Sequence, residues 1–134
     1  MSFYGILILR VGLGIVFLYF GFNQIIEPKA WIDLVPSIFS NFVNLKVFIY
    51  LNGIFDLVIG ICLILGLFIK IISLLGFIHL MSIFLFSLKF TPSGIRDLGL
   101  AFAILSLYFL GEDRFNIKNF LSKIKNEKQN FRSK

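Results

Sequence analysis

Four stretches of this chain are long and apolar enough to cross a lipid bilayer, and this limits its fold more than any other feature. They cover about residues 4–26, 46–69, 70–89 and 95–111. A helix of about 20 mostly apolar residues spans the hydrocarbon core of a membrane. Almost no loop separates the second stretch from the third, and this demands an antiparallel hairpin there. The sequence therefore predicts an all-α integral membrane four-helix bundle over residues 1–111, followed by a basic tail over residues 112–134.

Composition agrees with this assignment and excludes several other classes of protein. Hydrophobic residues make up 58% of the 134 residues and charged residues 15%, whereas charged residues make up about 25% of an ordinary soluble domain. This balance excludes three classes for the chain as a whole: a disordered chain, a coiled coil and a nucleic-acid-binding tail. The lipid bilayer is the expected environment, and no nucleic acid is expected as a partner.

Cysteine and histidine are represented by one residue each, Cys62 and His79. One cysteine cannot form an intramolecular disulfide or a Cys-x-x-Cys redox pair. The same counts exclude bis-histidine haem ligation and zinc or iron–sulfur sites built from Cys and His within one chain. We expect no metal and no covalently bound cofactor. A redox role would need a diffusible cofactor, such as a quinone, or a partner protein.

The links between the helices carry their own signals. Proline biases the residue before it away from helical geometry, so Glu27-Pro28 ends the first helix. Trp31 suits the membrane–water interface, and we expect a short interfacial helix within residues 31–42. A turn of Thr, Pro, Ser and Gly precedes the fourth helix, with Ser93 as its expected N-cap.

Basic residues set the expected orientation. The tail holds seven basic and three acidic side chains. Together with Lys70, which falls on the same side of the membrane, this places eight basic residues on one side and four on the other. The positive-inside rule then places both termini in the cytoplasm, with the helices in the cell (inner) membrane. Ile117, Phe120, Leu121 and Ile124 also recur at helical spacing among lysines. We expect an amphipathic helix on an anionic leaflet; the alternative is a soluble tail that only enforces the orientation.

Six polar residues within or at the start of the apolar stretches form a candidate intramembrane site. A charge at the bilayer centre costs roughly 2.5–3.5 kcal/mol on insertion scales, so a charged side chain there is expected to have a partner or a function. The six are Arg10, Asn52, Asp56, His79, Arg96 and Asp97.

Arg10 lies on a helical stripe with Gly14, Phe17, Gly21 and Gln24. Two glycines on one stripe allow a neighbouring backbone to approach closely, so we expect this stripe to face other helices. The alternative is that Arg10 snorkels to the interface, since it lies only about 9 Å from the helix start at 1.5 Å per residue.

Asp56 is too deep in the second helix to reach water, and it shares a face with Asn52, Gly53, Gly60 and Leu63. Two states are open: an ion pair with an arginine such as Arg10, or a protonated carboxylic acid that donates a hydrogen bond. In either state Asp56 can belong to a functional site or to a polar clasp that only holds the helices together.

The other polar residues also have two interpretations. Asp97 lies in the first turn of its helix, where the helix dipole favours a carboxylate. Arg96 shares a face with Gly99, Ala103 and Ser106. His79 is either a hydrogen-bonded structural residue or a proton relay and donor to a quinone carbonyl.

Several of these motifs together resemble the DoxX family of small four-helix membrane proteins. They are Leu9–Gly14 with the Glu27-Pro28 stop, Gly53–Asp56 with Gly60, and Arg96–Leu100. The family usually has glutamate in place of Asp56 and a lysine in place of Asn23-Gln24. The resemblance implies a four-helix bundle and, for some relatives, a subunit of thiosulfate:quinone oxidoreductase.

Three functions follow from the residues and the resemblance. The first is a quinone-linked membrane oxidoreductase subunit that acts with a redox partner, in which Arg10, Asp56 and Gln24 bind a quinone or an oxyanion. The second is a non-catalytic membrane scaffold or assembly factor. The third is a small-solute or proton pathway, which would need a homo-oligomer because four helices leave little room for a pore.

Overall fold

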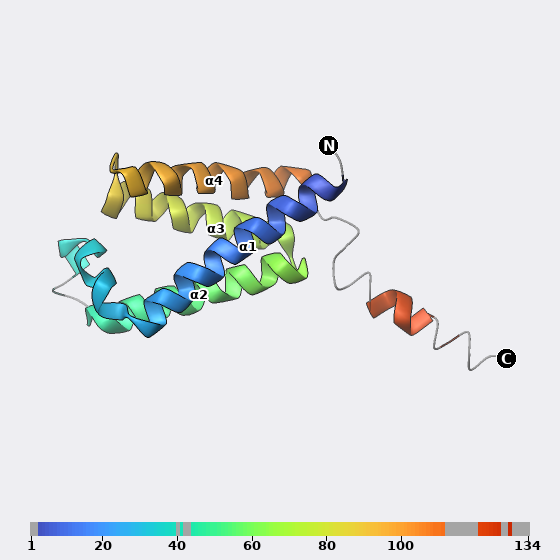
Figure 1. Ribbon diagram of the computed structural model, residues 1–134, viewed down its shortest axis with the longest axis horizontal. Helices are drawn as coiled ribbons and strands as arrows, with labels where there is room; N and C mark the ends of the chain where they lie inside the picture. The colour runs from blue at the N-terminus through green and yellow to red at the C-terminus, as the bar shows by residue number, and fades with distance from the viewer. Residues whose placement is uncertain (1–2, 40, 42–43, 112–120, 127–128, 130–134) are drawn as a thin grey trace.

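Four long helices account for most of the chain, as the sequence predicts (Figure 1). The computed structural model describes residues 3–39, 41, 44–111, 121–126 and 129. The helices are α1 (Phe3–Ile26), α2 (Leu45–Leu65), α3 (Ile69–Ile83) and α4 (Pro92–Leu110). A π-helix, Phe84–Leu88, continues α3, and the combined segment Ile69–Leu88 is long and apolar enough to cross a membrane, as are the other three helices.

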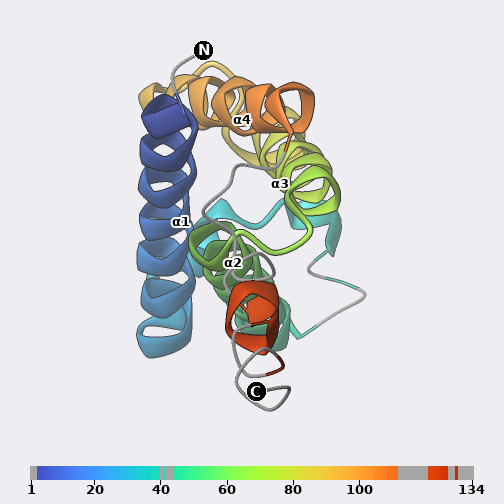
Figure 2. The same cartoon turned by 90° about the vertical axis from the view of Figure 1, so that its right-hand side faces the viewer.

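The helices pack as two close pairs, α1 with α2 and α3 with α4, whereas α2 and α3 touch over a much shorter stretch (Figure 2). The start of α1, the turn between α2 and α3 and the end of α4 lie at one end of the bundle (Figure 1). The opposite end holds the α3–α4 turn and the chain that follows α1.

Glycines bring α1 and α2 together. A Cβ atom on Gly21 would lie 2.8 Å from the carbonyl oxygen of Gly53, and a Cβ atom on Gly14 would lie 3.0 Å from that of Gly60. The backbones therefore meet directly at two levels, as small-residue stripes in membrane helices allow. The stripe that carries Arg10 faces α2, and Arg10 is only 2% exposed. Arg10 therefore does not snorkel to the membrane surface in this structure.

An apolar cluster fills the half of the bundle nearer the α2–α3 turn. It contains Leu13, Phe17, Ile59, Leu63, Ile69, Ile72, Leu80, Ala101, Ile104 and Leu107. Large apolar side chains also cover the outside of the helices, including Ile8, Tyr19 and Phe109. This exposed apolar surface fits a bundle that is surrounded by lipid rather than by water.

Two helix ends differ from the predicted ones. α2 ends at Leu65 rather than at residue 69, because Gly66 adopts a left-handed conformation (φ 72°) that closes the helix. α4 begins at Pro92 rather than at residue 95. Its N-cap is Thr91, whose hydroxyl accepts a hydrogen bond from the Gly94 N–H at 3.1 Å, so the expectation that Ser93 caps this helix is wrong.

The link after α1, where a short interfacial helix is expected within residues 31–42, forms two short 3₁₀-helices, Pro28–Leu34 and Ser37–Phe39. Prolines at positions 28 and 36 interrupt helical geometry on either side of the first of them. In the tail, residues 121–126 are helical, as the amphipathic pattern predicts. Two members of that pattern, Ile117 and Phe120, lie outside the described residues.

The α1–α2 contact predicts a position-dependent effect of adding one methyl group. Gly21→Ala should lower the free energy of unfolding by about 1–3 kcal/mol, because the new Cβ must push the two backbones apart. Gly12→Ala, on the same helix, meets nothing within 4 Å and should leave stability unchanged or raise it through helix propensity. Thermal unfolding of both variants in detergent measures the difference. Equal effects would contradict a close α1–α2 contact at Gly21.

Candidate functional site

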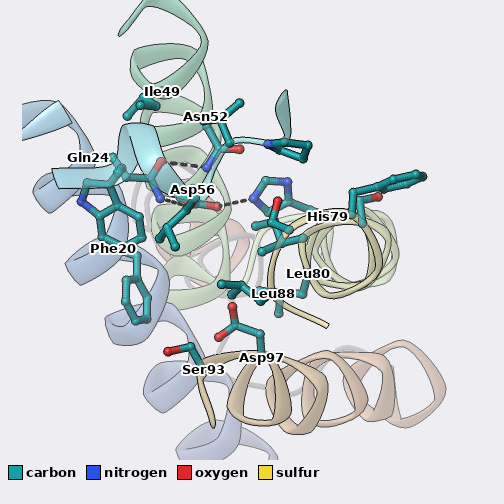
Figure 3. Close-up of a pocket in the computed structure, with 18 of the residues that line it drawn as sticks. Phe20, Gln24, Ile49, Asn52, Asp56, His79, Leu80, Leu88, Ser93 and Asp97 are labelled. Atoms are coloured by element: carbon teal, nitrogen blue, oxygen red, sulfur yellow. Dashed lines mark hydrogen bonds and ion pairs between the residues drawn. The ribbon is translucent and has the colours of Figure 1, made fainter. Parts of the chain in front are cut away.

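A cavity of about 490 Å³ lies at the end of the bundle opposite the α2–α3 turn. All four helices and both 3₁₀-helices contribute to its walls (Figure 3). The walls are mostly aliphatic and aromatic, with a few polar side chains that point inward. This size and lining are typical of cavities that bind small molecules or cofactors.

Gln24 links two helices on one wall of this cavity. Its Nε2 donates a hydrogen bond to Asp56 Oδ2 at 3.0 Å, and its Oε1 accepts one from Asn52 Nδ2 at 2.7 Å. Asn52 and Asp56 lie one turn apart on α2 and therefore present the same face to α1. Gln24 can reach both because α1 and α2 approach closely at Gly21 and Gly53.

His79 brings α3 to the same carboxylate. Its Nε2 lies 3.0 Å from Asp56 Oδ1, and its ring packs edge-on against Phe55 with centroids 5.0 Å apart. Asp56 thus has a side-chain nitrogen within 3.0 Å of each of its two oxygens. The pair is close, yet neither Asp56 Oδ1 nor His79 Nε2 has an aligned hydrogen-bond partner among the described residues. Buried polar atoms in this state are open to a ligand or a water molecule.

A second polar pair lies on α4, across the cavity from Asp56. Arg96 Nε and Nη2 lie 2.9 and 2.8 Å from Asp97 Oδ1. Asp97 is buried and its carboxylate points from α4 toward the side of the cavity that holds Asp56, as Figure 3 shows. The Arg96 guanidinium also lies over the Phe20 ring, 4.8 Å from the ring centroid, a cation–π contact that fixes it between α1 and α4.

Of the polar residues that the sequence singles out, Gln24, Asn52, Asp56, His79, Arg96 and Asp97 line this cavity, whereas Arg10 does not. Gln24, Asn52, Asp56 and His79 form one polar cluster, and Arg96 with Asp97 forms the other. Asp56 is paired with Gln24 of α1 and His79 of α3, and within the described part of the chain neither partner is an arginine.

Arg10 lies at another level of the bundle. Its Nη2 is 3.5 Å from the Ile64 carbonyl oxygen, close to the α2–α3 turn. Fourteen residues separate it from Gln24 on α1, which is about 21 Å at 1.5 Å per residue. The expectation that Arg10 and Gln24 hold the same ligand therefore does not fit this geometry, and Arg10 lies outside the cavity.

Sequence analysis missed two aromatic residues of the site, Phe20 and Trp31. Phe20 packs edge-on against Trp31 with centroids 5.8 Å apart, beneath Arg96. Nothing in the sequence distinguishes Phe20 from the other 17 phenylalanines. Trp31 carries a signal for the membrane interface, but only the fold of the 3₁₀-helices turns it inward. No three His, Cys, Asp or Glu side chains of the described residues lie close enough together to hold a metal ion.

Comparison with known proteins identifies one family. The DoxX family model matches residues 5–89, which is more than half of the chain and includes α1, α2, α3 and most of the cavity wall. No curated protein and no solved structure matches the chain significantly.

Two neighbouring amides on α1 provide a test of the polar cluster. Gln24→Leu should lower the free energy of unfolding by about 1–3 kcal/mol, because it leaves buried groups of Asn52 and Asp56 without their partner. Asn23→Leu is the matched control, since Asn23 bonds only to the Tyr19 carbonyl of its own helix. Thermal unfolding in detergent compares the two. If the polar cluster does not stabilise the fold, both variants should have the same melting temperature.

Proposed function

The chain belongs to the DoxX family, and we propose that it is the quinone-binding membrane subunit of an oxidoreductase complex, with the quinone head group in the cavity between the four helices. The observation that carries the proposal is the pairing of an apolar cavity with two polar clusters on opposite walls. A quinone ring is flat and apolar on its faces and carries two carbonyl oxygens at opposite edges. The cavity offers complementary groups to each part.

The two polar clusters supply donors for the two carbonyls. On one wall, His79 Nε2 lies 3.0 Å from Asp56 Oδ1 without an aligned hydrogen bond, so a ligand oxygen in the cavity can compete with Asp56 for its N–H. On the other wall, Arg96 uses Nε and Nη2 on Asp97, and the guanidinium retains further N–H groups. Phe17, Phe20 and Leu80 line the space between them and suit the faces of the ring.

Reduction of a quinone to a quinol takes two electrons and two protons. The chain has one cysteine and one histidine, so the electrons must come from a partner protein that carries a redox cofactor. His79, held 3.0 Å from Asp56 Oδ1, is placed to deliver one of the two protons to a carbonyl oxygen, and the partner protein must supply the other proton together with the electrons. When the quinol is oxidised, the same pair accepts the proton in return.

The alternatives make different use of the same residues. In a scaffold or assembly factor, the Gln24 cluster only clasps α1, α2 and α3 together, and the cavity binds nothing. A proton or solute pathway needs polar groups across the whole bilayer. The apolar cluster between the cavity and the α2–α3 turn is a barrier to such a path through one copy of the chain.

Trp31 gives a direct binding assay, because it is the one tryptophan of the chain and lines the cavity. A quinone bound in the cavity should quench its fluorescence in a saturable way in detergent or nanodiscs. Asp56→Asn and His79→Phe should each weaken binding by about tenfold or more, equivalent to about 1.4 kcal/mol, because His79→Phe removes the donor and Asp56→Asn removes the carboxylate that holds it in place.

Phe109→Leu serves as the control for this assay, since Phe109 lies on the exposed lipid face of α4 and outside the cavity. It should bind as the unmodified protein does. Quenching that does not saturate, or that is the same in all variants, would reject the quinone site. Stable co-purification of a partner protein together with that result would favour the scaffold.

The predicted orientation places the cavity near the outer surface of the cell membrane, because Lys70 and the basic tail belong to the opposite end. In a Cys62→Ala background, Asp33→Cys should react with a membrane-impermeant maleimide on intact cells. Ser133→Cys should react only after the cells are permeabilised. Asp33 is exposed on the first 3₁₀-helix. Labelling of Ser133→Cys on intact cells, with Asp33→Cys labelled only after permeabilisation, would show that the orientation is the opposite of the predicted one.

A further inference from the structure

We propose that the ligand of this cavity is a lipid-soluble quinone with a long isoprenoid chain, which enters sideways from the bilayer through an aromatic portal. The portal lies between α3 on one side and the start of α2 with the second 3₁₀-helix on the other. This inference rests on the proposed function, and it adds the class of ligand and the route that its tail takes.

The end of the cavity that would face water is covered. Trp31, Leu34, Val35 and Pro36 line the cavity from the segment that crosses this end of the bundle. Figure 1 shows this segment folded over the end that holds the α3–α4 turn. A polar solute arriving from water would meet an apolar cover, so the cavity is not built for access from the aqueous side.

The side of the cavity between α1 and α4 is bridged. Arg96 reaches from α4 to the ring of Phe20 on α1, and Phe20 packs against Trp31. Together these three side chains join α4, α1 and the first 3₁₀-helix. A ligand tail could leave on this side only by breaking the cation–π contact.

The side next to α3 opens toward lipid, because Ser82 and Phe86 both line the cavity and are exposed on the surface of the bundle. His79, Ser82 and Phe86 lie on one face of α3 and its π-helical continuation, and all three line the cavity. His79 is 14% exposed and Phe86 is 66% exposed, so this face runs from the interior to the lipid surface. Phe39 and Phe48, stacked with centroids 5.6 Å apart, form the opposite rim.

The depth of this opening fits a lipid tail. Ser82 and Phe86 lie six and two residues before the end of the span Ile69–Leu88, or about 9 and 3 Å at 1.5 Å per residue. The portal therefore faces the acyl chains just inside the membrane surface. A cavity of about 490 Å³ holds a quinone ring but not a chain of many isoprene units. The remainder of that chain must pass outward, and the aromatic rims provide an apolar path.

Ser82 is a position at which the portal can be blocked, because among the described residues its hydroxyl donates to the Ile78 carbonyl of its own helix and to no other helix. Ser82→Phe should weaken binding of a quinone with a long isoprenoid chain by about tenfold. Binding of the same ring without a chain should change by less than about threefold. Trp31 quenching in nanodiscs measures both ligands.

Ile78→Phe is the matched control, since Ile78 lies one turn away on the lipid-exposed face of α3 and outside the cavity. It should alter binding of neither quinone. If Ser82→Phe changes neither ligand, or both equally, the portal is rejected while the quinone site stands. If the unmodified protein binds neither quinone, both proposals fail.

A second measurement does not depend on the folding of a variant. A long-chain quinone with a photoreactive group on its tail should label peptides that contain Ser82, Phe86 or Phe48 in the unmodified protein. Competition by an excess of unlabelled long-chain quinone should remove the label. Competed label on residues 31–36 in place of these peptides would show that the tail leaves through the cover and would overturn the portal.

Discussion

The direct contact between the backbones of α1 and α2 is the constraint on which the rest of the structure depends. In lipid the hydrophobic effect does not drive one helix onto another, so association relies on close packing and on hydrogen bonds between helices. Gly14 meets Gly60, and Gly21 meets Gly53, with no space for a Cβ atom. Only at this separation can the Gln24 side chain reach Asn52 and Asp56 together. The packing of small residues thus determines the position of the polar cluster.

The cavity follows from the way in which two tight pairs of helices meet. α1 with α2 and α3 with α4 are each closely packed, and the apolar cluster joins the pairs in one half of the bundle. In the other half the contact between α2 and α3 is short, and the 3₁₀-helices close the end. The buried side chains of Gln24, Asp56 and Asp97 lie in this half, around the cavity. Asp56 and His79 link the two pairs there, so the same contact stabilises the bundle and lines the candidate site.

The sequence predicts the helices well and the site in part. Hydropathy locates four spans because each must match the thickness of a bilayer, and polar residues inside those spans are few enough to name. Asn52, Asp56, His79, Gln24, Arg96 and Asp97 were all identifiable in this way, and all lie at the site. Arg10 met the same criteria but lies near Ile64, at the other end of α1. The depth of a residue along its own helix is readable from the sequence, whereas its partner on another helix is not.

The sequence by itself determined that this is a four-helix membrane protein of the DoxX family, with charged groups at bilayer depth that need partners. Only the tertiary structure decided which partners they have. Asp56 contacts Gln24 and His79 rather than Arg10, and Phe20 and Trp31 become part of the site through their contacts with each other and with Arg96. The physical reason is that periodicity specifies which face of a helix is buried, while the crossing and relative height of the helices depend on how their side chains pack against one another.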